Sequence, residues 1–205
     1  MTGQNHSPHI SNNPIKHRES LWIEIADDRP TYMMFPLIDY TIHERVSVFQ
    51  KETLRNFFER IDDSAHNFLG INRITNDEEL NSEVSRLLEK EKDLQHKYYL
   101  IQTHLGDPVA IFYVYGYQQK WGKTKIGFGL LPEYRGQGLA MPLLKPIIES
   151  LENENGICRI EGEIETKNIA SLHLGQRLMR DFGFEFEGVR KNNWGKGVDC
   201  RIYAR

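Results

Sequence analysis

The residues most able to do chemistry form a glycine-rich turn between a strand pattern and a helix pattern: Arg135, Gly136, Gln137, Gly138, Leu139 and Ala140. The first N–H groups of a helix have no partner inside the helix, and the aligned peptide dipoles place about half a positive charge at that end. Glycine lets a ligand approach the backbone closely, so phosphate oxygens can bind such amides, and Arg135 would add a fixed positive charge. The turn therefore indicates an anion site, with a simple strand-to-helix turn as the alternative.

Two better-known phosphate-binding patterns are incomplete at this turn. The Lys and the Ser or Thr of a P-loop do not follow Gly138, and no third glycine stands at the spacing of a Rossmann turn. The sequence therefore predicts a diphosphate site of another kind.

A second candidate group lies on the strand predicted over residues 157–166. Because side chains alternate between the faces of a strand, Glu161, Glu163 and Glu165 should share one face. Carboxylates so close together attract a cation and raise each other's pKa, which suits the removal of a proton from an amine. The alternative is a solvated strand face without a catalytic role.

The elements that position these groups follow from hydrophobic periodicity. Residues 98–103 and 109–117 are predicted to form a hairpin, followed by a strand over 125–131. Further elements are a helix over 138–154, the strand 157–166, a helix over 168–182, and strands over 184–190 and 198–204. Earlier in the chain, the spacing predicts a strand at 21–25 and helices over 42–61 and 76–96. This order implies an α/β (α+β) domain, with a mixed sheet and helices on its faces.

Three local features refine this outline. Asn76, with Glu79 three residues later, is predicted to cap the helix that follows, whose apolar stripe either packs on the sheet or binds a partner. Pro146 lies inside the helix 138–154 and should remove one hydrogen bond and bend the helix. One face of the second hairpin strand is predicted to carry Val109, Ile111, Tyr113, Tyr115 and Tyr117.

The composition is that of a soluble globular chain, with 205 residues, 39% hydrophobic and 27% charged. One domain over residues 20–205 is expected after a polar tail of residues 1–19. A net charge of −3 argues against nucleic-acid binding. The lack of a long apolar run or secretory signal predicts a cytoplasmic protein that does not enter membranes. Cys158 and Cys200 have no metal-ligand spacing, so no metal site is predicted.

Several motifs, in order, resemble the GNAT superfamily of N-acetyltransferases. Arg135-x-x-Gly138-x-Ala140 is similar to the acetyl-CoA signature of that family. The later part is similar in Asn168-x-x-Ser171, Gly183-Phe184, Glu187-Gly188 and a closing strand from Asp199 to Tyr203. The likeness covers residues 98–205, and its pattern is most similar to the branch that acetylates the N-termini of ribosomal proteins.

This resemblance implies a single GNAT-like domain whose sheet is mostly antiparallel and twisted. The strands 125–131 and 157–166 would splay into a V that holds the pantetheine arm of acetyl-CoA. The turn residues 135–140 would bind the diphosphate through their amides, and the main chain of Leu130 and Leu131 would bind the pantetheine. Asn168 and Ser171 would lie beside the pantetheine amide and sulfur, although Asn168 also fits a helix N-cap.

The resemblance further implies direct attack of a neutral amine on the thioester. Ser171 matches the serine proposed as the acid in that branch. Many relatives have a tyrosine where this chain has Gly175, and the branch's proposed base, a glutamate, falls on Trp194 here. The base is therefore not carried over, and water relayed through Glu161 or Glu163 is the hypothesis.

The acceptor is predicted to be a primary amine: a protein N-terminus, a polyamine, an amino sugar or another small amine. The chain would be a monomer or a homodimer. The alternative, motivated by the missing tyrosine and glutamate, is a sensor that binds acyl-CoA without turnover.

Overall fold

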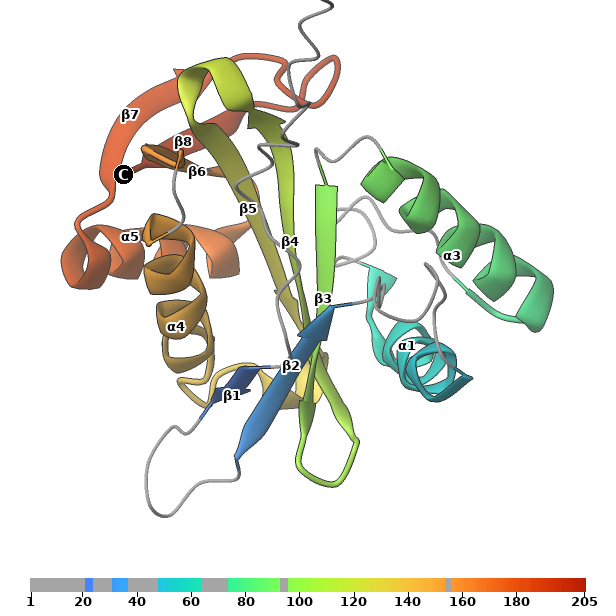
Figure 1. Cartoon of the computed structure of the whole chain (residues 1–205). Coiled ribbons are helices and arrows are strands. Elements are labelled where there is room, and N and C mark those ends of the chain that lie inside the picture. Colours follow the sequence, from blue (N-terminus) through green and yellow to red (C-terminus); the bar gives the residue numbers. More distant parts are fainter. Residues whose placement is uncertain (1–20, 24–30, 37–47, 64–73, 93–95, 154–155) are drawn as a thin grey trace, which may run out of the picture.

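The computed structural model describes the chain except for residues 1–20, 24–30, 37–47, 64–73, 93–95 and 154–155 (Figure 1). The described strands and helices follow in the order β1 (Leu21–Ile23), β2 (Tyr32–Pro36), α1 (Val48–Arg60), α3 (Asp77–Lys92), β3 (His96–Thr103), β4 (Pro108–Gln118), β5 (Lys123–Leu130), α4 (Ala140–Glu152), β6 (Arg159–Glu165), α5 (Ile169–Phe182), β7 (Glu185–Arg190) and β8 (Cys200–Ala204). The predicted strands and helices occur in the predicted order, but β2 corrects the prediction, because the sequence indicated an irregular link between Pro30 and Pro36. The predicted tail of residues 1–19 lies outside the described residues.

The strands form one mixed sheet of eight, in the order β1-β2-β3-β4-β5-β6-β8-β7. Every neighbouring pair is antiparallel except β5 and β6, which run parallel. A parallel pair needs a crossover connection, and here α4 supplies it. The expected mixed, mostly antiparallel sheet is thus confirmed, with its one parallel step beside the glycine-rich turn.

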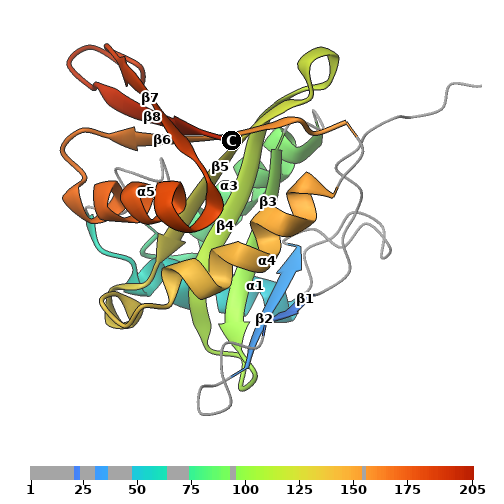
Figure 2. The same ribbon diagram turned by 90° about the vertical axis from the view of Figure 1, so that its left-hand side faces the viewer.

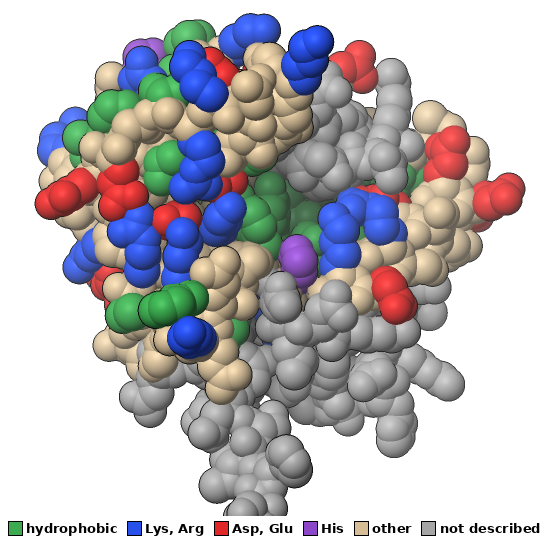
Figure 3. All heavy atoms as spheres, turned by 90° about the horizontal axis from the view of Figure 1, so that it is seen from above, with side chains coloured by type: hydrophobic (Ala, Val, Ile, Leu, Met, Phe, Trp, Pro, Cys, Tyr) green, Lys and Arg blue, Asp and Glu red, His purple; other side chains and the backbone are tan. Residues whose placement is uncertain are grey.

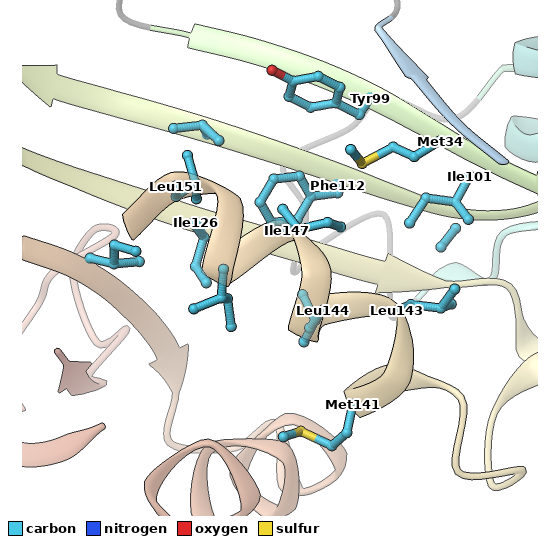
Figure 4. Close-up of a cluster of buried hydrophobic side chains, with 14 of the residues drawn as sticks. Met34, Tyr99, Ile101, Phe112, Ile126, Met141, Leu143, Leu144, Ile147 and Leu151 are labelled. Carbon is cyan, nitrogen blue, oxygen red and sulfur yellow. The ribbon is translucent and has the colours of Figure 1, made fainter. Parts of the chain in front are cut away.

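Helices cover both faces of the sheet (Figures 1 and 2). On one face, α1 and α3 bury an apolar stripe against the sheet: Leu54, Phe57, Phe58, Leu80, Val84 and Leu87 pack with Tyr98, Leu100 and Ile111. The stripe of α3 therefore packs on the chain's own sheet. On the other face, α4 packs Leu143, Leu144 and Ile147 against Phe112 and Ile126 (Figure 4). Each such fully buried side chain contributes about 1.5–3 kcal/mol.

The strand β4 corrects one prediction. Ile111 and Tyr113 face α1 and α3, as expected, but Val109 and Tyr117 pack on the α4 side. The pairing register of β4 shifts by one residue near each end. The first shift is against β3, between Ile101 and Gln102, and the second is against β5, between Tyr115 and Gln118 of β4. Each bulge turns the following side chains to the other face. Gly116, with φ of 62°, supplies the left-handed backbone at the second bulge.

The predicted cap of α3 is confirmed. The Oδ1 atom of Asn76 accepts a hydrogen bond of 2.9 Å from the N–H of Glu79. The Glu79 carboxylate accepts hydrogen bonds from the Thr75 N–H and hydroxyl, which lower its pKa. The helix α4 runs continuously from Ala140 to Glu152 with Pro146 inside it. No described helix has both the length and the apolar character needed to cross a membrane.

Candidate active site

The parallel pair β5 and β6 separates partway along its length. The two strands pair from Lys123 with Arg159 to Ile126 with Gly162, and no further. Beyond that point β5 stays with β4 as far as Leu130, while β6 stays with β8 as far as Glu165. One edge of residues 127–130 therefore has no strand partner, and its main-chain groups are available to a ligand. The expected V-shaped splay is confirmed.

A cleft lies at this separation and reaches both faces of the sheet. Its lining includes Tyr113, Gly127, Gly162, Glu163, Asn168, Ser171 and Trp194. A Cβ atom added to Gly162 would meet nothing within 4 Å, whereas one added to Gly127 would lie 2.1 Å from Cζ of Tyr113. The cleft is therefore open at Gly162 and covered by a tyrosine ring at Gly127.

The glycine-rich turn carries the donors expected of an anion site. Gly136 and Gly138 have φ of 72° and 75°, and neither would bring an added Cβ within 4 Å of another atom. The helix α4 begins after Leu139 without a side-chain cap. Within the described chain, no protein acceptor is found for the N–H groups of Gly136, Gly138, Leu139, Ala140 and Met141. These amides without a protein acceptor fit the diphosphate of acetyl-CoA.

The guanidinium of Arg135 was predicted to add positive charge to the anion site, but it binds to other groups of the protein. Its Nε donates to the carbonyl of Leu130 at 3.0 Å, and its Nη1 lies 2.5 Å from Oδ2 of Asp62, just after α1. Beside it, Arg60 pairs with Glu133 of the turn. Arg135 thus joins the turn to α1, and the anion is left mainly to the backbone amides. The partners are 73 residues apart, so no local pattern reveals them.

The main chain of Leu131 is already engaged within the protein. Its N–H donates to the carbonyl of Val109 at 3.0 Å, and its carbonyl accepts from the N–H of Tyr134 at 3.0 Å. The carbonyl of Leu130 accepts from Arg135. The edge without a strand partner therefore lies mostly before these two residues, at 127–129.

Asn168 and Ser171 come together at the start of α5, where both line the cleft. Asn168 caps the helix, because its Oδ1 accepts from the N–H of Ser171 at 3.1 Å. One turn later, a Cβ on Gly175 would lie 2.8 Å from Cζ of Tyr203 and 3.1 Å from Cδ1 of Ile164. A tyrosine at position 175 would therefore clash with Tyr203, which explains the glycine.

The glutamates of β6 are not a solvated face. Glu161 and Glu163 are both buried, with only 1% and 9% of their surface exposed. Oε1 of Glu161 lies 2.8 Å from Nζ of Lys123 and 2.9 Å from Nη2 of Arg159. Glu161 is absent from the cleft lining, whereas Glu163 and Glu165 are part of it. The structure therefore brings Glu163, and not Glu161, to the cleft.

Glu163 is surrounded by hydrogen-bond donors. Lys125 and Arg190 lie 2.7 and 2.8 Å from its Oε1, and Asn193 and Trp194 donate to its Oε2 at 3.0 and 3.1 Å. Burial alone would raise the pKa of Glu163, but the bonds from Lys125, Trp194 and Asn193 hold it below its ordinary value. The expected mutual rise in pKa is therefore wrong for this residue, because cations separate it from the other carboxylates.

Two tyrosines of the cleft were not singled out as site residues by the sequence. The ring centroids of Tyr113 and Tyr115 lie 5.5 Å apart, and Tyr98 stacks on Tyr113 at 5.8 Å. Burial raises the pKa of both Tyr113 and Tyr115. Seen from above, this side of the molecule has a hollow with hydrophobic side chains at its floor and Lys and Arg on two sides (Figure 3). Only the register of β4 on β5 reveals that Tyr113 lies opposite Gly127.

Comparison with known proteins agrees with this geometry. The sequence profile of the acetyltransferase (GNAT) domain matches residues 46–185. A search of curated proteins finds no match. Among the described residues, no cluster of side chains suited to a metal ion is present.

Several solved structures share the fold. One is the acetyl transferase of Salmonella typhimurium that modifies the N-terminal serine of 50S ribosomal subunit protein L7/L12, with 19% identity, a TM-score of 0.65, and coverage of 90% of this chain and 98% of that one. Ribosomal-protein-S5-alanine acetyltransferase from Vibrio fischeri has 16% identity, a TM-score of 0.62 and coverage of 90% and 96%. Spermidine N-acetyltransferase from Vibrio cholerae, solved with CoA and spermine, has 12% identity, a TM-score of 0.64 and coverage of 85% and 94%.

Proposed function

Because this chain belongs to the acetyltransferase (GNAT) domain family and is an acetyl-CoA-dependent N-acetyltransferase, we propose that its acceptor is a single primary amine, such as a peptide N-terminus. Acetyl-CoA supplies an activated acetyl thioester, which a neutral amine can attack directly. The observation that carries the proposal is the joining of two features. The cleft that contains Asn168, Ser171 and Glu163 is also lined by Leu144 of α4, and the first amides of α4 have no protein acceptor within the described chain.

The cofactor site is assigned mainly to backbone. The amides of Gly136 to Ala140 would bind the diphosphate, and the unpaired edge of β5 before Leu130 would bind the pantetheine. Asn168 would orient the start of α5 beside it. Arg135 would act by fixing the turn against Asp62, which keeps the amides directed outward.

Ser171 is assigned as the donor to the departing sulfur. It lies in the first turn of α5, lines the cleft and is partly exposed. Within the described chain its hydroxyl has no protein partner, so the hydroxyl can hydrogen-bond to a ligand. A donor there would stabilise negative charge as it develops on the sulfur.

Glu163 is assigned to the acceptor side. An amine of pKa near 10 is mostly protonated at neutral pH and must lose a proton before it attacks. The pKa of Glu163 is lowered, so this carboxylate is a poor final acceptor for that proton. It is better suited to hold the ammonium group or a water that carries the proton away. The ion pairs of Glu161 with Lys123 and Arg159 favour a structural role for that residue.

The charges beside the cleft favour an acceptor with one amine over a polyamine. The charged groups at and beside the cleft include four carboxylates, Glu161, Glu163, Glu165 and Glu187, and four cations, Lys123, Lys125, Arg159 and Arg190. These groups together have no excess of negative charge with which to attract a polycation. Spermidine would therefore gain no net electrostatic attraction at this cleft.

The experiment is a CoA-release assay with acetyl-CoA and a panel of acceptors: peptides with different N-terminal residues, spermidine and an amino sugar. We expect release with at least one peptide and a lower kcat/KM for spermidine. The same peptides with acetylated N-termini are the control, because they lack the attacking amine. Tight binding of acetyl-CoA without release for any acceptor would contradict the proposal and favour a sensor.

A further inference from the structure

A tyrosine hydroxyl lies at the apex of the V. Tyr113 of β4 pairs directly with Gly127 of β5, and Gly127 is the first β5 residue beyond the last pair with β6. A Cβ on Gly127 would lie 2.1 Å from Cζ and 2.5 Å from Oη of Tyr113. The phenol end of Tyr113 therefore rests directly over Gly127, and only glycine at this position leaves room for it.

The ring of Tyr113 is held firmly in this position. It stacks on Tyr98 at a centroid distance of 5.8 Å and contacts the tilted ring of Tyr115 at 5.5 Å. The residue is partly exposed, and it lines the cleft together with Ser171 and Glu163. Within the described chain, no protein partner is found for its hydroxyl. The hydroxyl is thus fixed at the cleft and able to bond to a ligand.

Packing alone explains the ring but not the hydroxyl. An aromatic ring over a cross-strand glycine stabilises a sheet, and phenylalanine would serve equally well. Within the described chain the protein gives this hydroxyl no partner, and its place in the cleft lining leaves it within reach of a ligand. The hydroxyl at this place therefore indicates a partner that the folded chain itself does not supply.

We propose that the hydroxyl of Tyr113 donates a hydrogen bond to the acetyl thioester bound in the cleft. This inference rests on the proposed function. Ser171 approaches the cleft from α5, on the α4 side of the sheet, whereas Tyr113 approaches from the α1 and α3 side. Two donors from opposite faces can bond to different atoms of the thioester.

The environment of Tyr113 suits a donor that keeps its proton. Burial, followed by the neighbouring Tyr98, raises its pKa above the ordinary value. The phenol therefore remains protonated at neutral pH and acts as neither a base nor a charged group. A fixed neutral donor of this kind stabilises a carbonyl oxygen or sulfur as negative charge develops on it.

The test uses binding in the absence of any amine. Calorimetry would measure the Kd of acetyl-CoA and of desulfo-CoA, which lacks the thioester, for the full chain and for Tyr113→Phe. The phenylalanine keeps the ring over Gly127 and removes the hydroxyl. We expect the Kd of acetyl-CoA to rise about 3- to 10-fold, as for the loss of one hydrogen bond, and the Kd of desulfo-CoA to change less than about twofold.

Tyr98→Phe is the matched control. Tyr98 stacks on Tyr113 but does not line the cleft, so both Kd values should stay close to those of the wild type. An unchanged Kd of acetyl-CoA in Tyr113→Phe, or an equal loss for both ligands, overturns the inference. A wild-type chain that binds neither ligand overturns the proposed function as well. If Tyr113→Phe weakens only acetyl-CoA binding but the wild type acetylates no amine, the proposed acceptor is rejected, while the inference stands because it needs only the acetyl-CoA site of the proposed function.

Discussion

The start of α4 carries main-chain N–H groups that have no protein acceptor within the described chain, whereas the apex of the cleft carries side chains held by other side chains. Gly136 and Gly138 need only their own backbone conformation to direct amides outward. Glu163, in contrast, is fixed by donors from β5, β7 and the loop after β7. The comparison shows that the proposed diphosphate site depends on local backbone conformation, whereas the geometry around Glu163 depends on residues from distant parts of the chain.

The largest effect is expected at the glycine-rich turn, where main-chain amides would bind the diphosphate. Gly138→Val places a branched side chain at φ of 75°, which L residues rarely adopt, and turns the amides away from the anion. Losing about two charge-assisted hydrogen bonds should raise the Kd of acetyl-CoA about 100-fold by calorimetry. Gly183→Val is the matched control, since Gly183 has φ of 67° at the end of α5 and lies outside the cleft lining. An equal rise in Kd in both variants would mean that strain, and not lost amides, is responsible.

A smaller effect is expected at the apex of the cleft, where Glu163 is held by other side chains. Glu163→Gln removes the charge at the cleft, and we expect kcat to fall about tenfold, because a positioned group that relays a proton contributes less than a direct base. Glu161→Gln is the comparison, since Glu161 is buried but lies outside the cleft lining. Its main effect should be a loss of about 1–3 kcal/mol in stability, because Lys123 and Arg159 lose a charged partner, although Arg159 keeps Glu187. Steady-state kinetics and urea unfolding measure the two effects; equal kcat losses would remove the distinction between these residues.

The packing of Tyr113 on Gly127 should appear in a double-mutant cycle. Gly127→Ala alone should cost about 1–3 kcal/mol in urea unfolding, because its Cβ would overlap the Tyr113 ring. In a Tyr113→Ala background the same change meets the space left by the ring and should cost close to nothing. Costs that simply add in the double variant would show that the two residues do not touch.

The smallest effect concerns pH. The pKa of Glu163 is held below its ordinary value in the folded chain, so the unfolded chain binds protons first as the pH falls. The stabilisation from this residue is therefore complete above about pH 5 and is lost as the pH drops through the folded value. Thermal unfolding at pH 6 and pH 3.5 should show a smaller fall in Tm for Glu163→Gln than for the wild type. Parallel falls in the two proteins would mean that other carboxylates govern acid unfolding.

Local patterns were enough to predict much of the fold. Asn76 and Glu79 form the expected cap because cap and partner are three residues apart. The stripe of Leu80, Val84 and Leu87 is buried because its spacing matches a helix. The facing of Val109 and Tyr117 was not predictable, since each bulge arises from pairing with a neighbouring strand.

By itself, the sequence determined the strand, the glycine-rich turn and the helix that together direct amides at an anion, because glycine conformation and helix starts depend on adjacent residues. Only the tertiary structure decided what surrounds Glu163, which partner Arg135 takes, and that Tyr113 covers Gly127. These arrangements depend on strand register and on contacts between residues far apart in the chain. A change of strand register by one residue would turn Glu163 and Tyr113 to the opposite face of the sheet.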